Sequence, residues 1–213
     1  KENYLANPRK SGVQDSKYFI PIAKEIEYKV KDLPLDPYLL GFLIGDGELT
    51  QHVTFTTADL ECIEYLQKGL SDYSTCSIKK VSSAKYGYSI TTDTKQENPL
   101  FKILKDLNLI GHTIDKHIPS MYQYGSIEQR MELLRGLMDT DGYISKAGNC
   151  EFTTISQQLS EDVCKLLGSL GIRYKVSIKI GSYKKDSIKI NCNKVYRILI
   201  LTSKPIFKLK RKL

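Results

Sequence analysis

Two aspartates, Asp46 and Asp141, are the side chains in this sequence best placed to do chemistry. Each ends an apolar stretch that contains a small residue and is followed by glycine. The two stretches, residues 39–47 and 134–142, are similar to each other, and their aspartates lie 95 positions apart (141 minus 46). Two similar helices that end in Asp-Gly would each carry a carboxylate at the C-terminus. Neither solubility nor stability calls for this repetition, so the pair is a candidate functional site.

A bound divalent cation would offset the unfavourable electrostatics of two carboxylates at helix C-termini. A carboxylate at a helix C-terminus is disfavoured by up to about 1 kcal/mol, and two such carboxylates that come together also repel each other. Mg²⁺ prefers carboxylate, carbonyl and water oxygens. The unpaired helix-end carbonyls of Gly45 and Thr140 could therefore add to Asp46 and Asp141 as ligands. Two carboxylates with metal ions beside a basic surface suit phosphodiester hydrolysis.

A simpler explanation is that Asp-Gly only ends each helix, with glycine as the C-cap. For one occurrence this explanation is preferred, whereas two occurrences at matching places in a duplicated unit favour a site. Asp139 is a weaker candidate than Asp141, because its counterpart in the first copy is Ile44.

Small residues within the two stretches predict that the helices touch. Gly41 and Gly45 lie four positions apart, on one face of a helix, and Gly136 lies within the second stretch. A glycine inside a soluble helix costs about 1 kcal/mol relative to alanine. Close approach of another backbone would explain these glycines.

Composition and charge narrow the class of protein. The 213 residues are 41% hydrophobic and carry a net charge of +8, which suits one folded domain or two small ones. From Lys175 to Leu213 there are twelve basic residues and one acid, which favours a polyanionic partner such as nucleic acid or anionic lipid, although a solubilising surface is the alternative. No apolar run approaches the roughly 20 residues that span a bilayer, and no signal peptide is visible, so we expect a cytoplasmic or nuclear protein and no membrane partner. Five scattered cysteines and three histidines suggest neither disulfides nor zinc.

The patterns predict one series of elements, helix, strand, strand, helix, strand, strand, helix, that occurs twice. Asp36-Pro37 starts the first key helix, and Ser126 with Gln129 forms a capping box for the second. The predicted ranges are strands at 48–50, 53–57, 76–81 and 86–92 with helices at 59–72 and 98–109, then strands at 150–154, 174–180 and 194–202 with a helix at 158–170. Lys204-Pro205-Ile206-Phe207 resembles the start of the helix at 98–109.

This duplication divides the chain into four parts. Residues 1–32 form an irregular arm with a short extended piece at 18–22, residues 33–109 the first repeat, 110–125 a linker and 126–213 the second repeat. Duplicated units of this kind can pack about a pseudo-two-fold axis.

At this point the sequence resembles the LAGLIDADG homing endonucleases. Residues 40–47 and 134–142 match that motif, and the duplicated order matches the two-motif, single-chain form. Residues 33–41, Lys116-His117-Ile118-Pro119 and residues 136–142 are similar to blocks of the endonuclease domain found inside inteins. The resemblance covers about residues 33–213.

The resemblance implies a fold, an activity and a set of site residues. The fold would be α/β (α+β), an αββαββα unit repeated twice, with the motif helices central and two antiparallel sheets forming a saddle over double-stranded DNA. A monomer with internal pseudo-dimer symmetry would use Mg²⁺ or Mn²⁺ to cut both strands of a long asymmetric site across the minor groove, leaving short 3′ overhangs. Asp46 and Asp141 would bind metal, and Lys116 would act on the scissile phosphate or polarise the attacking water; an ordinary solvated linker lysine is the alternative. Lys212 is the nearest candidate for a second such lysine.

Two departures from the family pattern shape the expected function. The chain lacks a leading Cys or Ser nucleophile and a terminal His-Asn, so self-splicing is not expected. It would be an excised or truncated endonuclease domain or a free-standing relative. Members of this fold can also lose cleavage and act as RNA maturases or DNA-binding regulators, but both motif acids are retained here, which favours catalysis.

Strand alternation predicts which side chains meet DNA. In the second repeat Lys175, Ser177 and Lys179 share one parity and would face the DNA, whereas Val176, Ile178 and Ile180 would face the core. The analogous candidates in the first repeat are Ser77, Lys79, Tyr86 and Tyr88. A solvated sheet face is the alternative for each of them.

Overall fold

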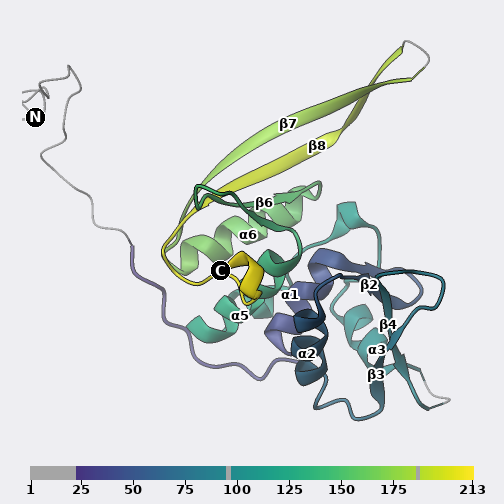
Figure 1. Cartoon of the computed structure of the whole chain (residues 1–213). Coiled ribbons are helices and arrows are strands. Elements are labelled where there is room, and N and C mark those ends of the chain that lie inside the picture. The colour runs from purple at the N-terminus through teal and green to yellow at the C-terminus, as the bar shows by residue number, and fades with distance from the viewer. Residues whose placement is uncertain (1–22, 95–96, 186–187) are drawn as a thin grey trace, which may run out of the picture.

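The computed structural model describes residues 23–94, 97–185 and 188–213 and shows the same series of elements twice, except that the second series lacks the last helix (Figure 1). The first series is α1 (Pro37–Asp46), β1 (Gly47–Leu49), β2 (Val53–Thr56), α2 (Leu60–Gly69), β3 (Cys76–Lys80), β4 (Gly87–Thr92) and α3 (Pro99–Asp106). After a 3-10 turn, η2 (Thr113–Asp115), and a short helix, α4 (Ser120–Gln123), the second series is α5 (Ile127–Thr140), β5 (Gly142–Ile144), β6 (Cys150–Thr154), α6 (Gln157–Ser169), β7 (Arg173–Lys185) and β8 (Ile188–Leu201). A last 3-10 turn is η3 (Lys210–Lys212).

Each series forms one antiparallel sheet of four strands. The strand orders are β1-β2-β4-β3 and β5-β6-β8-β7, so the two sheets have the same topology. The predicted duplicated α/β fold is confirmed. No helix in the described ranges combines the length and the apolar character that a bilayer crossing requires.

The two motif helices, α1 and α5, pack along each other at the centre of the molecule. The Asp36 side chain caps α1 by accepting a hydrogen bond from Leu39 N at 2.9 Å, and Pro37 occupies the first helical turn. Ser126 and Gln129 form the predicted capping box of α5. Residues 38–45 of α1 are all buried, which explains why this helix is apolar on every side.

The β7–β8 hairpin is longer than its sequence pattern predicts. Gly181-Ser182 suggests a turn, but the pairing continues past it with a register shift between Ile180 and Ser182. The expectation that Val176, Ile178 and Ile180 face the core is wrong, since these side chains are 40%, 59% and 60% exposed. The outer part of the hairpin extends beyond the rest of the molecule (Figure 1), so α6, which contacts β7 and β8, does not cover its apolar face there.

The end of the second repeat also departs from the predicted duplication. Where α3 follows β4 in the first repeat, the segment after β8 is irregular and ends in the single turn η3. The backbone N–H groups of Lys208 and Leu209 donate to the Asp139 carboxylate, at 3.1 and 3.3 Å. This segment is therefore shaped by a contact with α5 instead of by a helix of its own.

Residues 23–36, the described part of the arm before α1, are irregular and lie along the second repeat. Ile26 N donates to Ser169 O at 2.9 Å, and Lys31 N donates to Gln129 Oε1 at 3.1 Å. The buried Arg130 guanidinium donates to Ile26 O and lies 4.8 Å from the centre of the Tyr28 ring. The extended piece expected at 18–22 lies outside the described residues.

Candidate metal and nucleic-acid site

Asp46 and Asp141 line one cleft of about 710 Å³ between the two repeats. Asp46 is the last residue of α1 and Asp141 is the C-cap of α5, so each carboxylate lies where a motif helix passes into the first strand of its sheet. Gly45 and Lys116 line the same cleft. The packing of α1 on α5 therefore brings together two carboxylates that are far apart in the sequence.

The two carboxylates are electrostatically unsatisfied. Both side chains are open to solvent, yet the protein around them removes part of their hydration, which raises the pKa of both carboxyls. Repulsion from Asp46 adds to this effect at Asp141, whose pKa is raised to about 6, although Lys116 and Lys212 act in the opposite direction. Among the described residues, neither carboxylate accepts a hydrogen bond.

Two lysines lie at the C-termini of the two motif helices. Lys116 Nζ donates to the Gly45 carbonyl at 2.5 Å. Lys212 is buried, and its Nζ donates to the carbonyls of Met138, Asp139 and Gly142 at 2.9, 2.8 and 2.7 Å. Burial lowers the pKa of both ammonium groups. An ammonium at a helix C-terminus is stabilised by the helix dipole, so each lysine is held beside a motif carboxylate.

The donor set at this cleft fits a hard divalent cation. No group of three or more His, Cys, Asp and Glu side chains suited to a metal occurs in the part of the chain that the structure describes. A cation would therefore rest on Asp46, Asp141, backbone oxygens, water and the oxygens of a bound phosphate, which are ligands that Mg²⁺ accepts. The Gly45 carbonyl accepts from Lys116, and the Thr140 carbonyl accepts weakly from Lys212, at 3.4 Å. Each carbonyl oxygen keeps a second lone pair for such a cation.

The glycines at the helix interface leave no room for a larger side chain. A Cβ atom on Gly41 would overlap the Leu133 carbonyl, and one on Gly136 would overlap the Tyr38 carbonyl and lie 2.7 Å from Phe42 N. A Cβ atom on Gly45 would overlap the Thr140 side chain. The two helices thus touch through their backbones.

The glycines after the two aspartates do not act as left-handed helix caps. Gly47 has an extended backbone, with φ −69° and ψ 132°. Positive φ angles among the described glycines occur at Gly148 and Gly171, so Gly142 is not left-handed either. Added Cβ atoms at Gly47 and Gly142 would overlap the carbonyls of Leu43 and Met138. The two glycines therefore still follow directly on the motif helices, but through close contact with the last turn of their own helix instead of a left-handed cap.

The candidate DNA contacts of the first repeat do not share one face. Lys79 lies opposite Ser89 in the register, whereas Tyr88 is on the other face of the sheet, where its ring stacks on Phe55 at 5.6 Å. Tyr88 is therefore a wrong choice for that face, and Tyr86 lies in the turn before β4 instead of in a strand. The Ser77 hydroxyl is buried, with no hydrogen-bond partner in the described residues.

In the second repeat Lys175, Ser177 and Lys179 are exposed along β7. Sequence reasoning missed Arg197, which lies opposite Ser177 in the register and forms an ion pair with Glu151 of β6. Its place opposite Ser177 depends on the register between β7 and β8, and the sequence pattern alone does not give that register.

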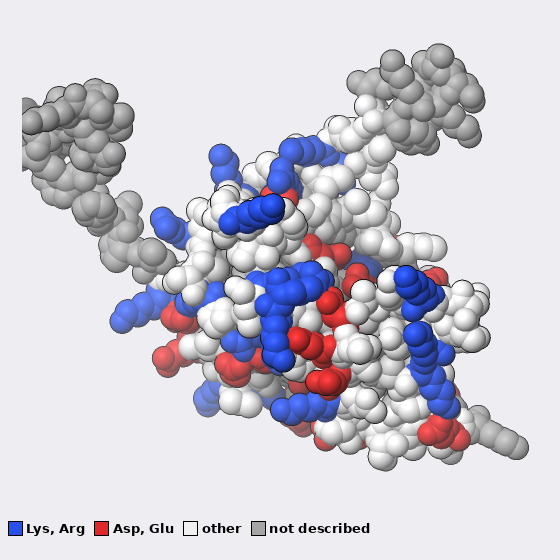
Figure 2. Space-filling model, viewed as in Figure 1, with Lys and Arg blue, Asp and Glu red and all other residues white. Residues whose placement is uncertain are grey.

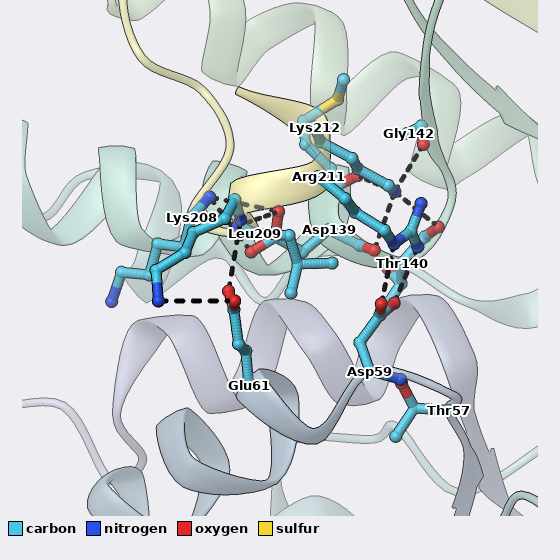
Figure 3. A network of polar contacts seen from close by, with 12 residues as sticks. Thr57, Asp59, Glu61, Asp139, Thr140, Gly142, Lys208, Leu209, Arg211 and Lys212 are labelled. Carbon is cyan, nitrogen blue, oxygen red and sulfur yellow. Dashed lines mark hydrogen bonds and ion pairs between the residues drawn. The ribbon is translucent and has the colours of Figure 1, made fainter.

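Sequence reasoning also missed what Asp139 does. This buried carboxylate accepts a hydrogen bond from Tyr38 Oη at 2.9 Å. It also accepts from the N–H groups of Lys208 and Leu209 (Figure 3). The one available signal was its presence in the second motif alone. Asp139 fastens the segment that carries Lys212 to α5.

Much of the basic charge near the C-terminal end is engaged within the protein. In Figure 2 basic and acidic side chains adjoin one another around the centre of the molecule. In the described part of the chain, five of these basic residues form ion pairs: Arg197 with Glu151, Lys204 with Glu25, Lys208 with Glu132, Lys210 with Glu61 and Arg211 with Asp59. Part of the charge that the sequence assigned to a polyanionic partner thus joins segments of this chain.

The paired motif helices, each leading into an antiparallel sheet, define the fold of the LAGLIDADG homing endonucleases. A solved structure described as mesophilic variants of the homing endonuclease I-DmoI shares this fold, with a TM-score of 0.52 and 17% identity over 78% of this chain and 82% of that one. The N-terminal LAGLIDADG domain of DUF199/WhiA aligns with a TM-score of 0.41 and 16% identity, over 76% of this chain and 73% of that one.

A family model supports this fold for the second repeat. Residues 128–213 match the family model described as a LAGLIDADG-like domain. The chain is also 31% identical over 190 residues to a protein of Mycobacterium intracellulare named replicative DNA helicase DnaB. The match takes in 89% of this chain but 28% of that protein, so the chain spans little more than a quarter of its length.

Proposed function

We propose that this protein is a metal-dependent, site-specific DNA endonuclease that makes double-strand breaks. The observation that carries the proposal is the cleft in which Asp46 and Asp141 lie without hydrogen-bond partners in the described chain, each beside a lysine that caps a motif helix. Two such half-sites, one for each repeat, suit a substrate with two phosphodiester bonds to cut.

In this proposal the aspartates and the lysines of the cleft have different roles. Asp46 and Asp141, with the carbonyls of Gly45 and Thr140, would hold the cation, and a bound Mg²⁺ or Mn²⁺ would supply activation of a water and neutralisation of the leaving oxygen. Lys116 and Lys212 place positive charge close to the two scissile phosphates. Their hydrogen bonds to helix-end carbonyls fix the ammonium groups before DNA arrives, so little reorganisation is needed during cleavage.

The two sheets would bind the DNA on either side of the cleft. The exposed face of β7 offers Lys175, Ser177 and Lys179, and the β7–β8 hairpin is much longer than β3–β4. Unequal sheets suit a long asymmetric site, with cleavage across the minor groove that leaves short 3′ overhangs. We propose that the chain acts as a monomer, with residues 33–109 and 126–213 as its two repeats.

We also propose that the domain derives from an intein. It corresponds to 28% of a protein named for another activity, as an inserted domain would, and its Lys116-His117-Ile118-Pro119 block is similar to one found in intein endonucleases. The proposal that the domain cuts DNA does not depend on this origin.

A cleavage assay tests the proposal directly. The protein is incubated with a library of double-stranded DNA sites with Mg²⁺ or with a chelator, and the cut ends are sequenced. We expect cleavage of a single site in Mg²⁺ and none with the chelator. Asp46→Asn and Asp141→Asn should abolish double-strand cleavage and leave binding of that site largely intact.

Cleavage that persists in both aspartate variants would refute the assignment. Specific binding by the unsubstituted protein without any cut would instead support the alternative, a nucleic-acid-binding protein of this fold that has lost cleavage.

A further inference from the structure

The residues that cap α2 and α6, Asp59 and Ser156, occupy equivalent places in the two repeats. Each follows a threonine by two positions, and its backbone N–H donates to that threonine hydroxyl. The distances are 3.2 Å from Asp59 N to Thr57 Oγ1 and 3.1 Å from Ser156 N to Thr154 Oγ1. The same local structure therefore begins the second helix of each repeat, and neither cap residue belongs to the cleft chemistry described above.

Asp59 holds the segment that carries Lys212 (Figure 3). Its carboxylate makes no capping hydrogen bond to α2 within the described residues. It accepts instead from Nε and Nη2 of Arg211, at 2.8 and 2.7 Å, in a two-pronged ion pair. In the first turn of α2, Glu61 accepts from Lys210 N at 3.2 Å. A helix of the first repeat thus positions the lysine that caps α5 of the second repeat.

Ser156, in the second repeat, holds the segment that carries Lys116. Its hydroxyl donates to the carbonyl of Lys116 at 2.6 Å, while the Lys116 side chain reaches the Gly45 carbonyl at the end of α1. Two residues further on, Ile118 N donates to the buried Asp162 carboxylate at 3.1 Å. A helix of the second repeat thus positions the lysine that caps the motif helix of the first repeat.

We propose that Asp59 and Ser156 are positioning residues that place Lys212 and Lys116 across the boundary between the repeats. Neither side chain contacts the reacting atoms; each acts through the backbone or the neighbour of a lysine. Because each lysine is anchored on the other repeat, a half-site is complete only when both repeats are docked. The part of this inference that concerns cleavage rests on the proposed endonuclease function, whereas the anchoring itself does not.

Hydrogen–deuterium exchange tests the anchoring without DNA or metal. Asp59→Ala should raise the exchange rates of the amides of residues 208–213 by about tenfold or more, because the two-pronged ion pair that holds Arg211 on α2 is lost. The matched control is Glu64→Ala, which removes one exposed acid from the same helix and should leave those rates unchanged. Arg211→Ala should match Asp59→Ala, and the double variant should exchange no faster than either single variant. Unchanged protection of 208–213 in Asp59→Ala would overturn the proposal.

Strand-resolved cleavage tests the crossed arrangement. Lys212→Ala and Lys116→Ala first establish which DNA strand depends on which lysine. Asp59→Ala should then slow the strand that depends on Lys212 by about tenfold and spare the other, and Ser156→Ala should slow the opposite strand. Ser126→Ala removes a helix cap of another helix and controls for lost stability. Equal slowing of both strands in both variants would overturn the crossed assignment.

The two tests also separate this inference from the proposed function. A protein that cuts no DNA under any condition would refute the endonuclease, and the exchange experiment would still decide whether Asp59 anchors residues 208–213.

Discussion

Asp141 shows how a single carboxyl group can link pH, metal and stability. Its pKa in the folded protein, about 6, lies above the ordinary value of 3.8 because of lost hydration and repulsion from Asp46. A raised carboxyl pKa contributes stability that is complete below the ordinary value and is lost as the pH rises through about 6. Without metal, the ionised Asp141 should therefore lower the free energy of unfolding at neutral pH. A bound cation should restore it.

Thermal unfolding at two pH values checks this reasoning. At pH about 7.5 we expect Mg²⁺ to raise the melting temperature of the protein. At pH about 5 the effect should be much weaker, because most of Asp141 is then protonated and the proton competes with the ion. Asp141→Asn should raise the melting temperature in a chelator at the higher pH and remove the response to Mg²⁺. The exposed Asp72 provides the control, since Asp72→Asn should leave that response as it is.

Lys116 gives a second prediction at the scale of one residue. Its ammonium lies in the cleft with both motif acids and donates to the Gly45 carbonyl, so we expect it to act on a phosphate instead of reading the DNA sequence. Lys116→Ala should therefore slow single-turnover cleavage by about a hundredfold or more with similar affinity for the site. An unchanged rate would remove Lys116 from the site, and weaker binding at an unchanged rate would make it a simple phosphate contact.

Some of these residues could be found from the sequence and others could not. Asp46 and Asp141 are recognisable because a duplicated chain repeats them, and repetition is visible without coordinates. The role of Asp139 depends on which distant backbone reaches it, and its partner Lys208 is 69 positions away. No local sequence pattern predicts a contact between residues so far apart in the chain.

At the scale of elements, the contact of α1 with α5 forms both the domain interface and the floor of the site. The helices can approach this closely only where Gly41 and Gly136 leave out a side chain. A methyl group at either place must push the helices apart, and the separation would move Asp46 away from Asp141. Stability and cleavage should therefore fall together.

Alanine at Gly136 tests this dependence against a matched glycine. Gly136→Ala should lower the free energy of unfolding by about 3 kcal/mol and reduce cleavage even at temperatures where the variant is folded. Gly168, within α6, has no atom within 4 Å of an added Cβ, so Gly168→Ala should raise the free energy of unfolding by about 0.5 to 1 kcal/mol. Denaturant unfolding of both variants measures the two changes. Equal stability of the two variants would contradict the backbone contact.

Elements were predicted well where two signals agreed and less well where only alternation was available. Capping residues and apolar spacing together located α1 and α5. In β7 the alternation of Val176, Ile178 and Ile180 correctly separates two faces, but it carries no information on how far α6 extends beneath them. Exposure there is set by the length of a neighbouring element.

For the whole molecule, the distribution of charge decides how the protein would meet DNA. Of the basic residues near the C-terminal end, Lys204 is paired with Glu25, whereas Lys175 on β7 is exposed. Only lysines free to displace counterions add to the salt dependence of DNA binding. The net charge of the sequence therefore overstates the charge available to a nucleic acid.

Binding isotherms over a range of salt concentrations measure how many of these charges contact DNA. Between about 50 and 200 mM salt the affinity for DNA should fall by at least tenfold. Lys175→Ala should reduce the slope of that dependence by about one, while Lys204→Ala should leave the slope nearly unchanged. A flat dependence for the unsubstituted protein would argue against an interface dominated by phosphates.

The arm before α1 has a consequence for how the molecule unfolds. Although it leads into the first repeat, Ile26 is bound to Ser169 and to Arg130 of the second repeat, contacts that span more than a hundred positions of the chain. The first repeat is thus enclosed between two attachments to its neighbour, the arm on one side and the Lys116 segment on the other. We expect these contacts to couple the unfolding of the two halves. The duplicated halves should consequently denature in one cooperative transition, and the many long-range contacts should make refolding slow.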